Sequence, residues 1–274
     1  MIWRWWSLIG LVAACGLSNL AYGQQQQPQQ AGSSPGISND AIAAIQQMGK
    51  TLSQESVSVK AQTFRMYPDV SGDYLHIKHV INIAARRPDR MAVTATGDDG
   101  TTKLVYDGKQ ISVADIDDNK YSQIPMAGLD LDKMLEEISD RLGIDFPLAD
   151  LLTHDPAKSF LSGVTSGKEV GTVKIDGAPA RHLFFTQTGA TELELWLDKE
   201  RAIPRRLIIT YRAMPGQPNF VAEFADWNFN NRPSDAEFTF QPPAGAQKVE
   251  LTKEGSARAG TTAAPASTPN TGRK

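Results

Sequence analysis

The feature that most constrains the fold of this chain is a two-residue alternation of apolar and polar side chains. Leu75, Ile77, His79 and Ile81 share one face of a predicted long strand, because successive side chains of a strand point to opposite faces. Comparable patterns occur at about residues 56–66, 73–86, 90–97, 102–107, 110–115, 119–124, 168–176, 180–187, 192–198, 205–212, 220–229 and 237–240. Most of the chain is therefore expected to form strands with one buried face and one wetter face.

Turn residues separate several of these segments. Asp107-Gly108, Asp117-Asp118-Asn119 and Asp176-Gly177 each stand between two strand patterns. Gly, Asn and Asp tolerate the positive φ that tight hairpin turns need. Successive hairpins predict strands in antiparallel order.

Two segments instead follow the helical period. The first has Asn39 as its expected N-cap, and the second starts near Asp130, pairs Glu137 with Arg141, and ends at Gly143 as the expected C-cap. Their apolar stripes consist of Ile42, Ile45, Met48 and Leu52 in the first helix and Leu131, Leu135, Ile138 and Leu142 in the second. About a dozen strands and two sizeable helices predict an α+β fold, in which helices close a highly curved antiparallel sheet or incomplete β-barrel.

The N-terminus has the pattern of an export signal over residues 1–23. Arg4 precedes a short apolar run, which is too short for the roughly 20 residues that cross a bilayer. Cleavage after the small residues Ala21 and Gly23 would release a protein that starts at Gln24. Cleavage at the alternative pattern that ends in Cys15 would give a lipoprotein anchored to the membrane by acylated Cys15. Both alternatives place the protein outside the cytoplasm, in the periplasm.

The rest of the chain is expected to be one domain between two tails. Residues 24–37 are rich in Gln, Pro and Ser and read as a disordered linker, residues 38–252 form the domain, and residues 253–274 are a disordered tail. Cys15 is the only cysteine, so the domain has no disulfide. The formal charge of −3 gives no electrostatic reason to expect nucleic acid as a partner.

The histidine and glutamate residues that could form a metal or catalytic site are explained better by ordinary structural roles. His76 and His79 lie three apart on one strand and therefore point to opposite faces, so we expect no metal site. Glu192 and Glu194 share a strand face at a spacing that a glycan hydrolase could use, but alternating Glu is also typical of a wet strand face. We therefore expect no catalytic residue and no cofactor.

Several segments resemble a known family. The run from Tyr106 to Val113, followed by Asp115 and Tyr121, resembles a hairpin of the bacterial periplasmic lipoprotein carriers. More of the chain resembles the uncharacterised periplasmic proteins grouped as domain of unknown function 2092. The matching segments are residues 86–90, 106–109, 146–152, 182–183, 195–197, 203–206, 226–228 and 238–246. Ala180 and Leu193 stand where that family often has Cys and Trp, so no role that needs that Cys carries over.

The resemblance implies an incomplete barrel with helices under its open side and an apolar cavity for acyl chains. A half-barrel must either fill its concave face with helices or offer it to an apolar ligand, and the sequence leaves both open. The candidates for lining such a cavity are Leu75, Ile77, His79, Ile81, His182, Phe184, Trp196 and Trp227.

Three functions remain from the sequence. The first is a non-enzymatic carrier that binds a lipid or the acyl chain of a lipoprotein. The second is a protein-interaction or envelope-sensor module that binds a partner protein and no lipid. The third is a glycan hydrolase that uses Glu192 and Glu194.

Overall fold

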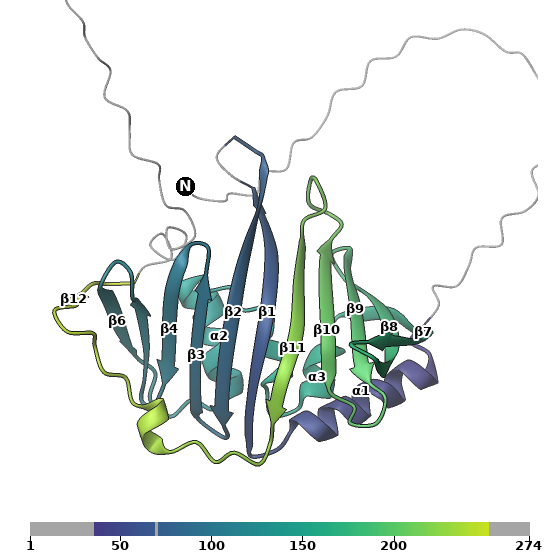
Figure 1. Ribbon diagram of the computed structural model, residues 1–274, viewed down its shortest axis with the longest axis horizontal. Coiled ribbons are helices and arrows are strands. Elements are labelled where there is room, and N and C mark those ends of the chain that lie inside the picture. The colour runs from purple at the N-terminus through teal and green to yellow at the C-terminus, as the bar shows by residue number, and fades with distance from the viewer. Residues whose placement is uncertain (1–35, 69–70, 252–274) are drawn as a thin grey trace, which may run out of the picture.

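The computed structural model describes residues 36–68 and 71–251, and these residues form one large curved sheet with helices on one side (Figure 1). The sheet has 12 strands in the order β12-β6-β5-β4-β3-β2-β1-β11-β10-β9-β8-β7. The strands are β1 (Ser56–Pro68), β2 (Tyr74–Arg86), β3 (Arg90–Gly97), β4 (Gly100–Tyr106), β5 (Gln110–Asp115), β6 (Lys120–Pro125), β7 (Val164–Ile175), β8 (Ala178–Gln187), β9 (Thr191–Asp198), β10 (Pro204–Tyr211), β11 (Asn219–Asn228) and β12 (Gln247–Lys248). The predicted α+β architecture, a curved open sheet with few helices, is confirmed.

The two halves of the chain meet in the middle of the sheet. Strands β1 to β6 follow one another outward by hairpins, and β7 to β11 return from the opposite edge until β11 pairs with β1. All neighbouring strands are antiparallel except β12, which pairs in parallel with β6. The three predicted turns lie between β4 and β5, between β5 and β6, and between β7 and β8. Each contains a residue with positive φ: Gly108 (80°) in the first, Asn119 (53°) in the second and Asp176 (49°) in the third.

Helices α1 (Asn39–Leu52), α2 (Leu131–Leu142) and α3 (Pro156–Phe160) all lie behind the sheet in Figure 1. We call the sheet face that they cover the inner face and the opposite one the outer face. The inner face is apolar because of the alternating strand side chains, and the helices turn their apolar stripes toward it. Buried residues of α1 and α2, such as Ile45 and Ile138, join one core with Ala61, Leu183 and Leu195 from the strands.

Three details differ from the sequence prediction. Ser38, not Asn39, is the N-cap of α1, since its Oγ accepts a hydrogen bond from the N–H of Ala41. The short helix α3 was not predicted. The predicted strand at 237–240 is wrong, because residues Asp235–Phe238 form the 3₁₀ helix η2. Its alternation arises from two aromatic rings that pack at separate places, Phe238 against Arg86 and Phe240 beside Tyr121.

Both ends of α2 lie where the sequence predicted them, near Asp130 and at Gly143. Asp130 accepts a hydrogen bond from the N–H of Lys133, and Gly143 adopts the left-handed conformation with φ of 66° as the C-cap. The N-terminal end is also tied to the sheet, because the hydroxyl of Tyr106 on β4 donates to the carbonyl of Leu129 (2.6 Å) and lies 3.0 Å from that of Met126. Tyr106 is fully buried, so this contact fixes where α2 begins over the inner face.

We predict that Tyr106→Phe lowers the free energy of unfolding by about 1–2 kcal/mol, because the buried carbonyl of Met126 and the partly buried carbonyl of Leu129 lose their hydroxyl partner. Urea denaturation measures this change. Tyr121→Phe on β6 is the control, since Tyr121 is only half-buried, and its effect should stay below about 0.5 kcal/mol. Equal effects of the two substitutions would contradict the anchoring role of Tyr106.

Candidate functional site

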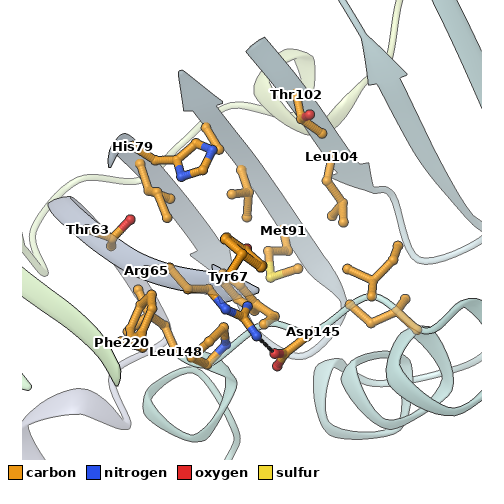
Figure 2. Close-up of a pocket in the computed structure, with 17 residues that line it drawn as sticks. Thr63, Arg65, Tyr67, His79, Met91, Thr102, Leu104, Asp145, Leu148 and Phe220 are labelled. Carbon is orange, nitrogen blue, oxygen red and sulfur yellow. Dashed lines mark hydrogen bonds and ion pairs between the residues drawn. The ribbon is translucent and has the colours of Figure 1, made fainter. Parts of the chain in front are cut away.

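A cavity of about 210 Å³ lies between the inner face of the sheet and the chain that leaves α2 (Figure 2). We call it the first cavity. Strands β1, β2, β3, β4 and β11 form its walls, and α2 with the segment after it forms its cover. It is lined by Thr63, Arg65, Tyr67, His79, Ile81, Met91, Val93, Ala95, Thr102, Leu104, Ile138, Ile144, Asp145, Phe146, Pro147, Leu148 and Phe220. Aliphatic and aromatic side chains dominate this lining, so most of the cavity is apolar.

Strand register brings the polar lining residues to the inner face. Thr63 lies opposite His79 in the antiparallel pair of β1 and β2, and Arg65 lies opposite Ile77. Directly opposed residues of such a pair point to the same face. The polar side chains of β1 therefore stand beside the apolar stripe of β2 that the alternation predicted.

His79 is held by a carboxylate at the cavity wall. Its Nε2 lies 2.6 Å from Oδ1 of Asp99, and both side chains are about one-fifth exposed. The ring lies over Gly97 on the neighbouring strand, where a Cβ would come within 2.4 Å of the imidazole. Glycine at this position therefore leaves the space that the imidazole of His79 occupies.

An ion pair between Arg65 of β1 and Asp145 connects the sheet to the segment Gly143 to Leu148 (Figure 2). Burial lowers the pKa of Arg65, but Asp145 together with Tyr67 and Tyr211 outweighs it, so the net effect raises the pKa. Burial also raises the pKa of Tyr67, whose ring centroid lies 4.8 Å from the guanidinium carbon. Arg65 is thus a charged group and Tyr67 a neutral hydroxyl donor at neutral pH.

The structure separates the cavity-lining candidates that the sequence proposed. His79 and Ile81 line the first cavity. Leu75 and Ile77 follow on the same face of β2 but beyond the cavity, where Leu75 is 53% exposed. Trp227 belongs to the buried core near the start of β10, where its Nε1 donates to the carbonyl of Pro204, and it does not line the cavity.

The other three candidates, His182, Phe184 and Trp196, lie on the outer face. Their strand neighbours Leu183 and Leu195 are the ones that point to the core. His182 stacks on Trp196 with ring centroids 4.3 Å apart, and Arg206 of β10 approaches the same indole ring. Alternation alone could not tell which face of these strands the helices cover.

Glu192 and Glu194 also lie on the outer face, and each binds a basic side chain. Glu192 pairs with Arg212 (2.7 Å), and Oε2 of Glu194 lies 2.8 Å from Nε2 of His182. Neither lines the first cavity. Among residues 36–68 and 71–251, no group of three His, Cys, Asp or Glu side chains is arranged to bind a metal.

Sequence reasoning missed the polar edge of the cavity, which is formed by Arg65, Tyr67 and Asp145. Arg65 and Tyr67 alternate with Phe64 and Met66, so the strand period could have placed them on one face. Asp145 could not be found in this way, because it lies outside the periodic segments. The export signal at 1–23, Cys15, nearly all of the predicted linker and the tail at 253–274 lie outside the described residues.

The part of the chain that the structure describes contains no helix long and apolar enough to span a bilayer.

Comparison with known proteins gives one family and several structural neighbours. A family model described as "Predicted periplasmic protein (DUF2092)" matches residues 41–252. An uncharacterized conserved protein from Thermus thermophilus has a TM-score of 0.45 and 12% identity, over 77% of this chain and 98% of that chain. LprF from Mycobacterium bovis has a TM-score of 0.44 and 13% identity, over 77% of this chain and 99% of that chain. The Mycobacterium tuberculosis lipoprotein LppX has a TM-score of 0.41 and 17% identity, over 70% of this chain and 97% of that chain. No curated protein sequence matches the chain.

We predict that Asp145→Asn loosens the segment over the cavity without unfolding the protein. The side chain of Asp145 is 56% exposed, so loss of its ion pair should lower the free energy of unfolding by no more than about 1 kcal/mol. The backbone amides of Ile144, Asp145, Phe146 and Leu148 should exchange with deuterium faster. Glu137→Gln, which removes the exposed Glu137–Arg141 pair of α2, is the control. The same exchange in both variants would show that Asp145 does not hold the segment.

Proposed function

The chain belongs to the DUF2092 family of predicted periplasmic proteins, and on that premise we propose that it is a periplasmic binding protein for an apolar chain. The chain would be part of a lipid or of an acylated lipoprotein, and the first cavity would receive it. The proposed role is to bind and shield the chain, without chemical conversion.

The observation that carries the proposal is an apolar cavity with a polar edge on the inner face of the sheet. Its volume of about 210 Å³ exceeds the roughly 150 Å³ of an engineered apolar cavity that binds benzene. Ligand sites combine such apolar walls with a few placed polar groups. In this chain Arg65, Tyr67 and His79 are those groups, and the remaining walls suit hydrocarbon.

The inner face also offers a surface on which a longer chain can continue. Ile77 and the exposed Leu75 extend the stripe of Ile81 and His79 along β2, away from the core. Exposed apolar residues in continuity with a cavity are typical of a binding site. A hydrocarbon chain that leaves the first cavity would therefore lie along β2.

The segment Gly143 to Leu148 is the natural gate of this site. It carries five lining residues, Ile144, Asp145, Phe146, Pro147 and Leu148, and its connection to β1 is the Arg65–Asp145 pair. An exposed ion pair contributes little stability, so breaking it costs little. Ile144 to Pro147, which are half-buried or exposed, could then move while the fully buried Leu148 stays in the core. Movement of this segment would admit the ligand.

A second candidate function rests on the outer face. His182, Trp196 and Arg206 lie in register on β8, β9 and β10, and Trp and Arg are the residues that dominate binding energy in protein interfaces. A partner protein of the envelope could dock there, which would make the chain an interaction or sensor module. This use of the outer face does not exclude a ligand in the first cavity.

The hydrolase hypothesis has less support. Glu192 and Glu194 are engaged with Arg212 and His182 on the outer face. A pair of carboxylates that acts on a glycan must flank the substrate bond.

Acylation of Cys15, which would anchor the protein to a membrane, stays a prediction.

We predict that Ala95→Trp weakens the binding of a fluorescent fatty acid by at least about tenfold, because the indole would occupy the first cavity. Fluorescence titration of the purified protein measures the dissociation constant. Thr94→Trp is the matched control, since Thr94 is the preceding residue of β3 and faces the outer side.

The control should bind the probe as the unchanged protein does. Equal binding by all three proteins would show that the probe does not use the first cavity. No binding by the unchanged protein, together with a clean mass after purification from its own envelope, would overturn the proposed function in favour of the interaction module.

A further inference from the structure

A second cavity of about 230 Å³ lies under the other half of the sheet. It is lined by Phe146, Pro147, Ala149, Asp150, Leu151, Phe160, Gln187, Thr191, Leu193, Leu207, Ile209 and Tyr211. Strands β8, β9 and β10 supply its sheet side, and α3 with the 3₁₀ helix η1 (Ala149–Leu151) supplies its helical side. The largest lining residues are again apolar, including Phe160, Leu193, Leu207 and Ile209.

The two cavities share one wall. Phe146 and Pro147 line both of them, so this dipeptide divides the space between the sheet and the helices. The first cavity lies under β1 to β4 and the second under β8 to β10. One short segment of chain thus borders two compartments at once. The second also has polar groups in its lining, namely Asp150, Gln187, Thr191 and Tyr211.

The polar side chains stand at the boundary between the two compartments. Arg65 and Tyr67 line the first cavity, and Tyr211 lines the second. Tyr211 lies within electrostatic reach of Arg65 and Asp145, and burial, followed by Asp145, raises its pKa. One cation and two neutral hydroxyl donors therefore gather next to the shared wall.

The charges of this group suit an anion that replaces Asp145. Arg65 is 20% exposed while Asp145 is 56% exposed, so the carboxylate can turn to water and leave the guanidinium in place. A guanidinium binds carboxylate or phosphate oxygens in a two-pronged manner, and the tyrosine hydroxyls can donate to the same oxygens. Departure of Asp145 would also release the segment that carries Phe146 and Pro147.

The volumes argue for a ligand that uses both compartments. Each cavity alone is smaller than the roughly 300 Å³ at which sites for drug-sized ligands begin, and the two together fall within the usual range. A ligand with one short chain would leave one compartment unused.

We propose that the ligand is an anionic amphiphile with two apolar chains, one chain in each cavity on either side of Phe146-Pro147, and its anionic head on Arg65 between Tyr67 and Tyr211. This inference rests on the proposed function and narrows it to a ligand class. A two-chain phospholipid with a net negative head has this chemistry.

The test compares three soluble lipids below their micelle concentrations, with the mature full chain. They are dioctanoyl phosphatidylglycerol, its one-chain lyso form, and dioctanoyl phosphatidylcholine, and native mass spectrometry with calorimetry gives stoichiometry and affinity. We expect one molecule of the two-chain anionic lipid per chain, bound at least about tenfold more tightly than either of the others.

Two variants assign the chains and the head. Leu193→Trp, which fills the second cavity, should reduce the affinity for the two-chain anionic lipid to that of the lyso form and leave the lyso form unaffected. Ala149→Leu fills less of the same space and should give an intermediate loss if Leu193→Trp proves unstable. Arg65→Gln should remove the preference for phosphatidylglycerol over phosphatidylcholine. Ile208→Trp, on the outer face of β10, is the control and should change nothing.

The outcomes separate this inference from the proposed function. If the lyso form binds as tightly as the two-chain lipid, or if Leu193→Trp weakens both equally, the two-cavity inference is wrong while the binding function stands. If phosphatidylcholine binds as well as phosphatidylglycerol, the requirement for a net negative head is wrong, and if Arg65→Gln binds both lipids as the unchanged protein does, the assignment of the head to Arg65 is wrong. Absence of binding by all three lipids would overturn both.

Discussion

The structure depends on keeping the inner face of one antiparallel sheet away from water. Alternating side chains make that face apolar along almost every strand, and removal of apolar surface from water is the main driving force of folding. The pairing of β1 with β11 joins the two halves of the chain, so a single inner face runs from β6 to β7. Helices α1, α2 and α3 must cover this whole face, and the two cavities lie where the cover meets the sheet incompletely.

The position of the cover follows from a few polar contacts. Tyr106 and the Asp130 cap fix the beginning of α2, and the left-handed Gly143 ends it. The chain then crosses the inner face as Ile144 to Leu148, with the Arg65–Asp145 pair as its tie to β1. A firmly anchored helix is thus followed by a crossing segment whose exposed Asp145 contrasts with the fully buried Leu148 at its end.

Much of the fold could be predicted from the sequence, since periodicity and turn chemistry are local properties. They placed the start of α2 near Asp130, its C-cap at Gly143, eleven of the strands and the three hairpin turns. The face of each strand was harder, because alternation in β8 and β9 is the same whichever face the helices cover, and His182 and Trp196 were therefore grouped with His79 although they lie on the opposite side. The strand predicted at 237–240 was wrong for a similar reason. Phe238 and Phe240 are two residues apart, as the apolar residues of a strand are, but they pack at two separate places.

The site was less predictable than the fold because its polar edge is made by residues far apart in the chain. His79 and Ile81 could be named from the stripe on β2, but Arg65 meets Asp145 across 80 positions. The most direct test of the central claim, that the inner face holds an apolar chain, is native mass spectrometry of the mature protein purified from its own envelope, followed by denaturation and lipid extraction. The account predicts a bound amphiphile that leaves on denaturation. A clean protein mass, with no uptake of added lipid afterwards, would contradict it.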